Sequence, residues 1–558
     1  MCDEDREEKQ DKRSRRKRKR KTVACVLLLL MSCAYLGVFL WIAHTGCLTW
    51  IGIVVGTILL APNIFIAVAG LAHKEKLEKR LCRISLCLGI AILVVLGILV
   101  FWPDPPGPWR SYTFDAEVAA FEAKRAVPGE ENAALRYEAA LSTVDVNDRP
   151  ESVSDVTLLL RRLSQEPWES EEQPEVSVWL DSHATLIHEL LKIGQMGECR
   201  WPMATEFGED SPVPYKQLAF AAQLFLLAGN RDLGEDRIEK SLEKSFWLLR
   251  HADHLYQQTH NTDLRIGFRR EELALQMIRY VLVRGEASPV DLEAIARHLP
   301  GTESTWNQDI ARLLRFDEVR FAQVMAPVYE FNGRGQIRFS ASAFPFLPKD
   351  KPPPKPRALS GKLWKLCCHM NMPLNPDDVW MMARQESSRV MRLLESGPVL
   401  PVPEDDLFNG KSFVYFVTNV LANLTRFMAR SLTFGISTYA SFGRSYAENL
   451  THRRGTWLVL GLRRYRDDHG SWPSSLDAIS AYVPAEAFVD PTSGGRFVYA
   501  LDGNSFRLYS TGVNRTDEGG RARYIEERDY CEDDILIWPL PKPEPRKPQP
   551  KHEDVDGV

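Results

Sequence analysis

The stretch that decides the predicted fold begins at Thr22-Val-Ala-Cys-Val-Leu-Leu-Leu-Leu-Met31, which opens the first of three apolar runs. The runs cover residues 22–43, 47–72 and 84–102, and none of them contains Asp, Glu, Lys or Arg. At about 1.5 Å of helical rise per residue, each is long enough to cross the roughly 30 Å hydrocarbon core of a bilayer. The sequence therefore predicts three transmembrane helices.

Basic residues around these runs predict an orientation. Nine of the ten residues in 12–21 are Lys or Arg, and the loop 73–83 carries five more, whereas the short link 44–46 has none. The positive-inside rule places both basic segments in the cytoplasm. Because the number of spans is odd, residues 104–558 are then extracytoplasmic. We expect a multi-pass protein of the inner (cytoplasmic) membrane with a cytoplasmic N-terminus.

Charge is divided unevenly along the 558 residues. Residues 1–103 hold 16 Lys and Arg against 8 Asp and Glu, which leaves 104–558 with a net charge of about −12. A body of that sign is poorly suited to nucleic acid, where basic residues supply most of the affinity. We therefore expect no nucleic-acid partner.

Beyond residue 103 the pattern is mainly helical. Apolar residues recur at helical spacing in 176–195, 215–229, 236–259, 263–284, 290–299 and 305–325. Ser288-Pro289 is a favourable helix start, because Ser caps the first turn and Pro fits within it. The predicted divisions are a basic cytoplasmic tail (1–21), a three-helix membrane block (22–103), an α-helical body (104–345), a Pro-rich linker and helix (346–408), a long helix with a small α+β module (409–538) and a disordered tail (539–558).

The segment 457–538 has the most specific pattern. A helix leads through Gly470 and Trp472-Pro473 to Asp490-Pro491. Two β-prone runs follow at 497–501 and 506–510, and an acidic stretch then precedes a last apolar run at 535–538. A short antiparallel sheet is expected here.

This order of motifs resembles the C-terminal half of the major pseudopilin of type II secretion systems. The matching residues are Tyr465, Gly470, Trp472, Pro473, Leu476, Asp490, Pro491, Gly494, Tyr499, Ser510, Gly512, Gly519, Asp534, Ile535 and Trp538. The whole layout also resembles uncharacterised large bacterial membrane proteins. The predicted three-span block replaces the single N-terminal helix through which pseudopilins assemble, so the resemblance implies a borrowed folding or docking module rather than a filament subunit.

The resemblance also implies a calcium site in the loop before the final strand. Asp517, Asp533 and Asp534 fall roughly where the family's ligands would lie. Calcium takes six to eight oxygen ligands, among them carboxylates and the carbonyls of a curved loop. The alternative is a solvated acidic loop without a metal.

Other candidate residues form no complete catalytic motif. His251, His254 and His260 lie near Asp253 on a predicted helix, where a spacing of three suits two ligands on one face, but no third ligand or acid is fixed beside them. Cys367-Cys368-His369 has no identifiable general base. A disulfide of Cys199 with Cys531 or with one of the adjacent pair, and buried free thiols, both remain open.

These patterns favour a non-enzymatic protein, and we predict no catalytic residue. The expected role is a membrane-anchored extracytoplasmic scaffold or interaction protein, with the lipid bilayer and envelope proteins as its partners. The alternative is an extracytoplasmic hydrolase of unrecognised family. A solute sensor with a ligand pocket between its helices is a third hypothesis.

Overall fold

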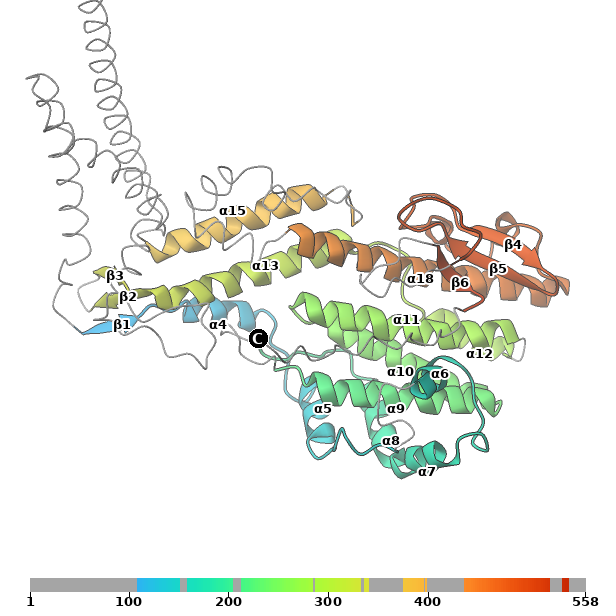
Figure 1. Cartoon of the computed structure of the whole chain (residues 1–558). Coiled ribbons are helices and arrows are strands. Elements are labelled where there is room, and N and C mark those ends of the chain that lie inside the picture. Colours follow the sequence, from blue (N-terminus) through green and yellow to red (C-terminus); the bar gives the residue numbers. More distant parts are fainter. Residues whose placement is uncertain are drawn as a thin grey trace, which may run out of the picture.

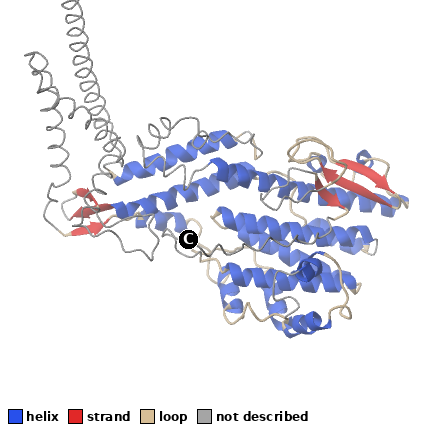
Figure 2. Cartoon of the chain, in the orientation of Figure 1, coloured by secondary structure: helices blue, strands red, loops and turns tan. Residues whose placement is uncertain are grey.

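A computed structural model describes residues 108–150, 158–203, 212–284, 287–332, 336–340, 375–395, 397–398, 436–521 and 534–540. Within them the chain is mainly helical, with two small three-stranded antiparallel sheets (Figures 1 and 2). The predicted basic tail 1–21, residues 541–558 of the predicted tail 539–558, and most of the Pro-rich linker and helix 346–408 lie outside the described residues.

The predicted fold class with three transmembrane helices, and the inner-membrane location built on it, require correction. Among the described residues no helix has both the length and the apolarity needed to cross a bilayer. The longest ones, α11 (Asn261–Arg284) and α18 (Ile436–His469), are interrupted throughout by charged side chains, whose insertion into lipid costs roughly 2.5–3.5 kcal/mol each. The three apolar runs, 22–43, 47–72 and 84–102, lie outside the described residues.

A layered array of helices forms the body (Figure 1). Its elements besides α11 are α4 (Asp115–Ala123), α5 (Ala133–Leu141), α6 (Leu158–Gln165), α7 (Pro174–Ser182), α8 (Ala184–Ile193), α9 (Tyr215–Gly234), α10 (Ile238–Tyr256), α12 (Pro289–His298) and α13 (Trp306–Met325). The predicted single helix over 176–195 is two helices that meet at His183. Helix α12 begins as predicted, with Ser288 and Asp291 forming a reciprocal cap.

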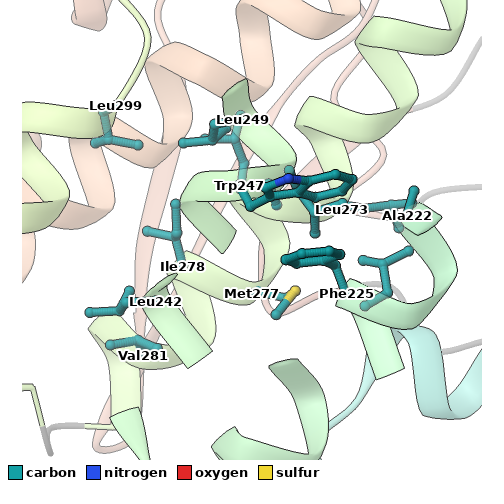
Figure 3. Close-up of a cluster of buried hydrophobic side chains, with 14 of the residues drawn as sticks. Ala222, Phe225, Leu242, Trp247, Leu249, Leu273, Met277, Ile278, Val281 and Leu299 are labelled. Carbon is teal, nitrogen blue, oxygen red and sulfur yellow. The ribbon is translucent and has the colours of Figure 1, made fainter. Parts of the chain in front are cut away.

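The main hydrophobic core lies between α9, α10 and α11. Phe225 and Trp247 stack with ring centroids 3.7 Å apart, and Met277 and Ile278 of α11 lie beside them (Figure 3). The indole of Trp247 donates a 2.7 Å hydrogen bond to the carbonyl of Leu190, which attaches α8 to this core. The core continues without a break into Leu458 of α18 and the C-terminal sheet.

A second core joins α13, α15 (Pro376–Leu394) and the first half of α18. Trp306 stacks on Phe442 at 5.8 Å, and its indole donates to the carbonyl of Leu394 at 3.0 Å. The hydroxyl of Tyr446 accepts from the backbone nitrogen of Thr305 at 2.7 Å. Helix α18 therefore contributes to both cores.

The C-terminal sheet lies at the end of α18 (Figure 1). Its strands are β4 (Val498–Asp502), β5 (Ser505–Ser510) and β6 (Ile535–Trp538), in the order β4-β5-β6. They coincide with the three β-prone or apolar runs of the sequence. A bulge at Leu508 and Tyr509 interrupts the pairing of β5 with β6.

The other sheet was not predicted. It consists of β1 (Trp109–Ser111), β2 (Tyr329–Asn332) and β3 (Ile337–Phe339), in the order β1-β2-β3. Strand β1 precedes all the helices of the body, whereas β2 follows α13, so the sheet connects the two ends of the helical array.

Candidate functional site

The acidic loop after β5 curls tightly over residues 511–521. Gly512, Arg515, Gly519 and Gly520 all have positive φ, between 59° and 76°. Glycine takes such angles without strain, and in this turn the N–H groups of Glu518 and Gly520 point toward Asp534 while that of Gly519 points toward Asp517. The loop thereby forms a concave backbone against the start of β6 at Asp534.

Two aspartates accept hydrogen bonds from this curled backbone. The Oδ2 atom of Asp534 accepts from the backbone nitrogens of Glu518 at 3.1 Å and Gly520 at 2.7 Å. The Oδ1 atom of Asp517 accepts from the nitrogen of Gly519 and the hydroxyl of Tyr509, both at 2.8 Å. The loop thus brings together two of the three aspartates predicted from the sequence, while Asp533 lies outside the described residues.

Unpartnered carboxylate oxygens remain in the same loop. Asp534 is fully buried, and its Oδ1 atom has no hydrogen-bond partner among the described residues. The Oε2 atom of Glu518 is buried without a partner in the same way, and its Oε1 atom accepts from Asn514 at 2.9 Å. Burial raises the pKa of Asp534 to about 6, and the Glu518 carboxyl, which lies within hydrogen-bonding reach, and the charges of Glu518 and Asp517 add to the increase.

Glu518 is not among the ligands predicted from the sequence. It follows Asp517 directly, and only the turn at Gly519-Gly520 places it near Asp534. The donor set is chemically suited to calcium, because it consists of hard carboxylate oxygens on a curved loop. It is also incomplete: in the described part of the chain no three His, Cys, Asp or Glu side chains are arranged to hold a metal ion.

A second buried aspartate in the module has a different environment. Asp490 accepts from Thr451 at 3.2 Å, from the nitrogen and hydroxyl of Thr492 at 3.0 and 2.7 Å, and from Ser510 at 2.6 Å. Ser493 also donates to it. These bonds join α18, the Asp490-Pro491 turn and β5, so Asp490 is a structural residue.

Arginines of α18 attach the module to the body. Arg453 forms a bidentate ion pair with the buried Glu271 of α11. Arg463 donates to the carbonyls of Leu282 at 3.0 Å and Ala287 at 2.9 Å. In the opposite direction, Arg279 of α11 donates to Thr456 at 2.9 Å. Carbonyl oxygens and a carboxylate compensate Arg463 and Arg453, whereas the Nε and NH2 atoms of the fully buried Arg279 have no hydrogen-bond partner among the described residues.

The histidines of α10 are structural. The ring of His254 contacts the Tyr137 hydroxyl at 3.2 Å and the Met196 carbonyl at 2.8 Å, and burial lowers its pKa to about 4. His251 is fully buried and stacks on Trp247. Neither ring faces a cleft that a substrate could enter.

The other candidate residues named from the sequence are Cys199 and His260, which the structure describes, and four that lie outside the described residues. Cys199 is a buried free thiol whose pKa burial raises, which opposes nucleophilic reactivity. His260 contacts Arg320 at 3.1 Å on its Nε2 atom. Cys367, Cys368, His369 and Cys531 lie outside the described residues.

Comparison with known proteins yields no relative: no family model, curated protein or solved structure matches the chain.

Proposed function

We propose that this protein is a non-enzymatic interaction scaffold, in which the helical body holds a pseudopilin-like C-terminal module in a fixed position. The observation that carries the proposal is the continuous core of α9, α10, α11, α18 and the C-terminal sheet. The ion pair between Arg453 and Glu271 adds directional contacts to that core. A rigid connection of this kind suits a protein that holds one interaction surface in a fixed position relative to the rest of the molecule.

The acidic loop is proposed to bind calcium and to order the module's exposed end. Glu518 and Asp534 would supply carboxylate oxygens, because Glu518 Oε2 and Asp534 Oδ1 have no hydrogen-bond partner among the described residues. Calcium would offset the burial of a carboxylate whose pKa is raised to about 6, and which is therefore unfavourably ionised at pH 7.

The test of the loop is thermal unfolding of the full chain in calcium, magnesium or chelator. Free calcium at one hundred times its Kd is expected to add about 2.7 kcal/mol of stability. Asp534→Asn should abolish this gain. Asp502→Asn, at an exposed acid of the β4–β5 turn, should leave it intact. Equal stabilisation by magnesium, or a full calcium gain in Asp534→Asn, contradicts the calcium site.

The scaffold itself is tested by crosslinking the full chain in lysate with and without calcium. Proteins crosslinked to the wild type and to Asp502→Asn, but lost with Asp534→Asn, would support a calcium-ordered interaction surface. Hydrolytic turnover by the purified chain, abolished by a single His or Cys substitution, would overturn the proposal in favour of the hydrolase.

A further inference from the structure

Helix α18 is attached to the body by different chemistry along its two halves. In the second half, Arg453 pairs with the carboxylate of Glu271, and Arg454 and Arg463 donate to backbone carbonyl oxygens. The guanidinium group of arginine stays charged throughout the physiological pH range. The contacts of the second half are therefore the same at pH 6 and at pH 8.

The first half, residues 436–450, docks through buried aromatic rings such as Phe442 and through two carboxyl groups. Asp317 of α13 lies on one side of this contact, and Glu448 of α18 faces α11 on the other. In the described part of the chain neither carboxyl forms an ion pair, whereas the buried Glu271 is paired with an arginine. The first half is thus attached by acids that lack a cationic partner.

Asp317 accepts a hydrogen bond across the contact between α13 and α18. The hydroxyl of Tyr439 donates to its Oδ2 atom, and Glu318 adds a negative charge beside Tyr439. The cation that faces Asp317 is Arg320 of the same helix, which contacts the Nε2 atom of His260 at 3.1 Å. Burial raises the pKa of Asp317 to about 7, although the Tyr439 hydrogen bond and the charge of Arg320 oppose the increase.

Glu448 has a comparable environment on the side of α11. Its Oε1 atom is buried and has no hydrogen-bond partner among the described residues. Glu272 of α11 faces it with a negative charge, and Arg265 of α11 and Arg444 of α18 face it with positive charges. Burial, reinforced by the charge of Glu272, raises the pKa of Glu448 to about 7. His452, one turn further along α18, lies 3.9 Å from Glu272 and is neutral at pH 7, because burial lowers its pKa to about 4.

The two carboxyls stabilise the docked helix only while they carry a proton. Because their folded-state pKa values are raised, this contribution is fully present below about pH 4 and is lost as the pH rises through 7. We propose that residues 436–450 form a proton-sensitive clamp, which stays docked on α11 and α13 while Asp317 and Glu448 are protonated and detaches increasingly often as they ionise.

The second half of α18 and the C-terminal sheet stay attached when the clamp opens, because arginines and the continuous core hold them. The clamp shares no residue with the acidic loop, so the inference does not rest on the proposed function. A detached segment loses the packing that keeps a short helix folded in water, so its amide hydrogens exchange with solvent.

The experiment is hydrogen exchange of the full chain at pH 6 and pH 8, with each rate compared with that of the unstructured chain at the same pH. Protection of 436–450 is expected to fall about tenfold for each carboxyl, and so about a hundredfold in the wild type. Protection of 458–469 should change by less than about threefold. Asp317→Asn or Glu448→Gln alone should leave about a tenfold fall, and the double variant almost none.

Glu303→Gln, at an exposed acid just before α13, is the matched control and should show the wild-type fall. An equal fall in 436–450 and 458–469 would mean that the whole molecule loses stability, and it overturns the proposal. Unchanged protection of 436–450 between the two pH values, or a wild-type fall in the double variant, does so too. If the double variant unfolds, a wild-type fall in both single variants is equally decisive against the clamp.

Discussion

Asp490 and Asp534 are both fully buried in the C-terminal module, yet their oxygens are satisfied to different degrees. Hydroxyl and backbone donors engage both oxygens of Asp490. One oxygen of Asp534 is left without a partner among the described residues. Because an unpaired buried polar atom costs about 1–3 kcal/mol, the arrangement around Asp534 is the one that a bound cation would improve.

Another unsatisfied carboxylate lies between α11 and α18. Glu448 has a buried Oε1 atom without a partner in the described part of the chain, and Glu272 faces it from α11. Burial, together with the negative charge of Glu272, raises the pKa of Glu448 to about 7, while Arg444 and Arg265 oppose the shift. The folded protein therefore takes up a proton here that the unfolded chain would release.

Glu448→Gln is expected to change how stability depends on pH. Because the folded-state pKa is raised, the contribution of Glu448 to stability is fully present below about pH 4. The free energy of unfolding of the wild type then falls by up to about 3 kcal/mol as the pH rises through 7. The glutamine variant should lose less stability over that range and be the more stable protein at pH 8. Urea unfolding at pH 5 and pH 8 measures the difference.

Glu243→Gln, at an exposed position of α10, is the control for that measurement and should keep the wild-type pH dependence. Equal stability losses for the wild type and Glu448→Gln between pH 5 and pH 8 would show that Glu448 is not protonated in the folded state.

At the scale of elements, α18 owes its contact with the sheet to a missing side chain. Gly455 faces β6, and a Cβ atom added there would lie 2.6 Å from both Cγ1 and Cδ1 of Ile537. Real carbon atoms do not approach so closely, so glycine is required for the strand to pack against the helix. Helical propensity alone would favour alanine at this position by about 1 kcal/mol.

Gly455→Ala is therefore expected to destabilise the protein by about 1–3 kcal/mol through overpacking, despite the gain in helix propensity. Chemical denaturation of the full chain gives the value. Ile537→Val removes one methyl group from the crowded site and should recover part of the loss in the double variant. Additive losses in the double-mutant cycle would rule out a steric contact between the two positions.

At the scale of the whole molecule, the body and the C-terminal module share one core. Leu458 of α18 is completely buried in the cluster that also holds Phe225 of α9 and Leu508 of β5. On folding, Phe225 is therefore buried together with Leu458 and Leu508, which lie more than two hundred positions away in the sequence. Cooperative unfolding of α9–α11 and the sheet follows from this arrangement.

Leu458→Ala should cost about 2–5 kcal/mol, the usual range for a truncated core leucine. Hydrogen-exchange mass spectrometry should show protection falling by a similar amount in α11 and in β5. Leu313→Ala, in the second core, is the comparison variant and should have its largest effect on α13 and α15. Loss of protection in β5 with α11 unchanged would mean that the module unfolds separately.

Local sequence predicted a good part of the described structure. The Ser288-Pro289 helix start and the strands within 497–538 follow from short-range patterns of caps, turns and alternation. The nearness of Asp517 to Asp534 was expected only from the resemblance to the pseudopilin family. The break at His183 and the sheet containing β1 escaped prediction. The latter pairs segments more than two hundred residues apart, which no local pattern records.

By itself, then, the sequence determined most of the helices, the strands within 497–538 and the places where acidic residues gather, because backbone hydrogen bonding and side-chain periodicity act over a few neighbouring residues. Tertiary structure alone decided that His254 and Cys199 are buried and that Glu518 lies near Asp534. Burial and hydrogen-bond satisfaction depend on which distant segments pack together, and that follows from the core shared between α9–α11 and α18.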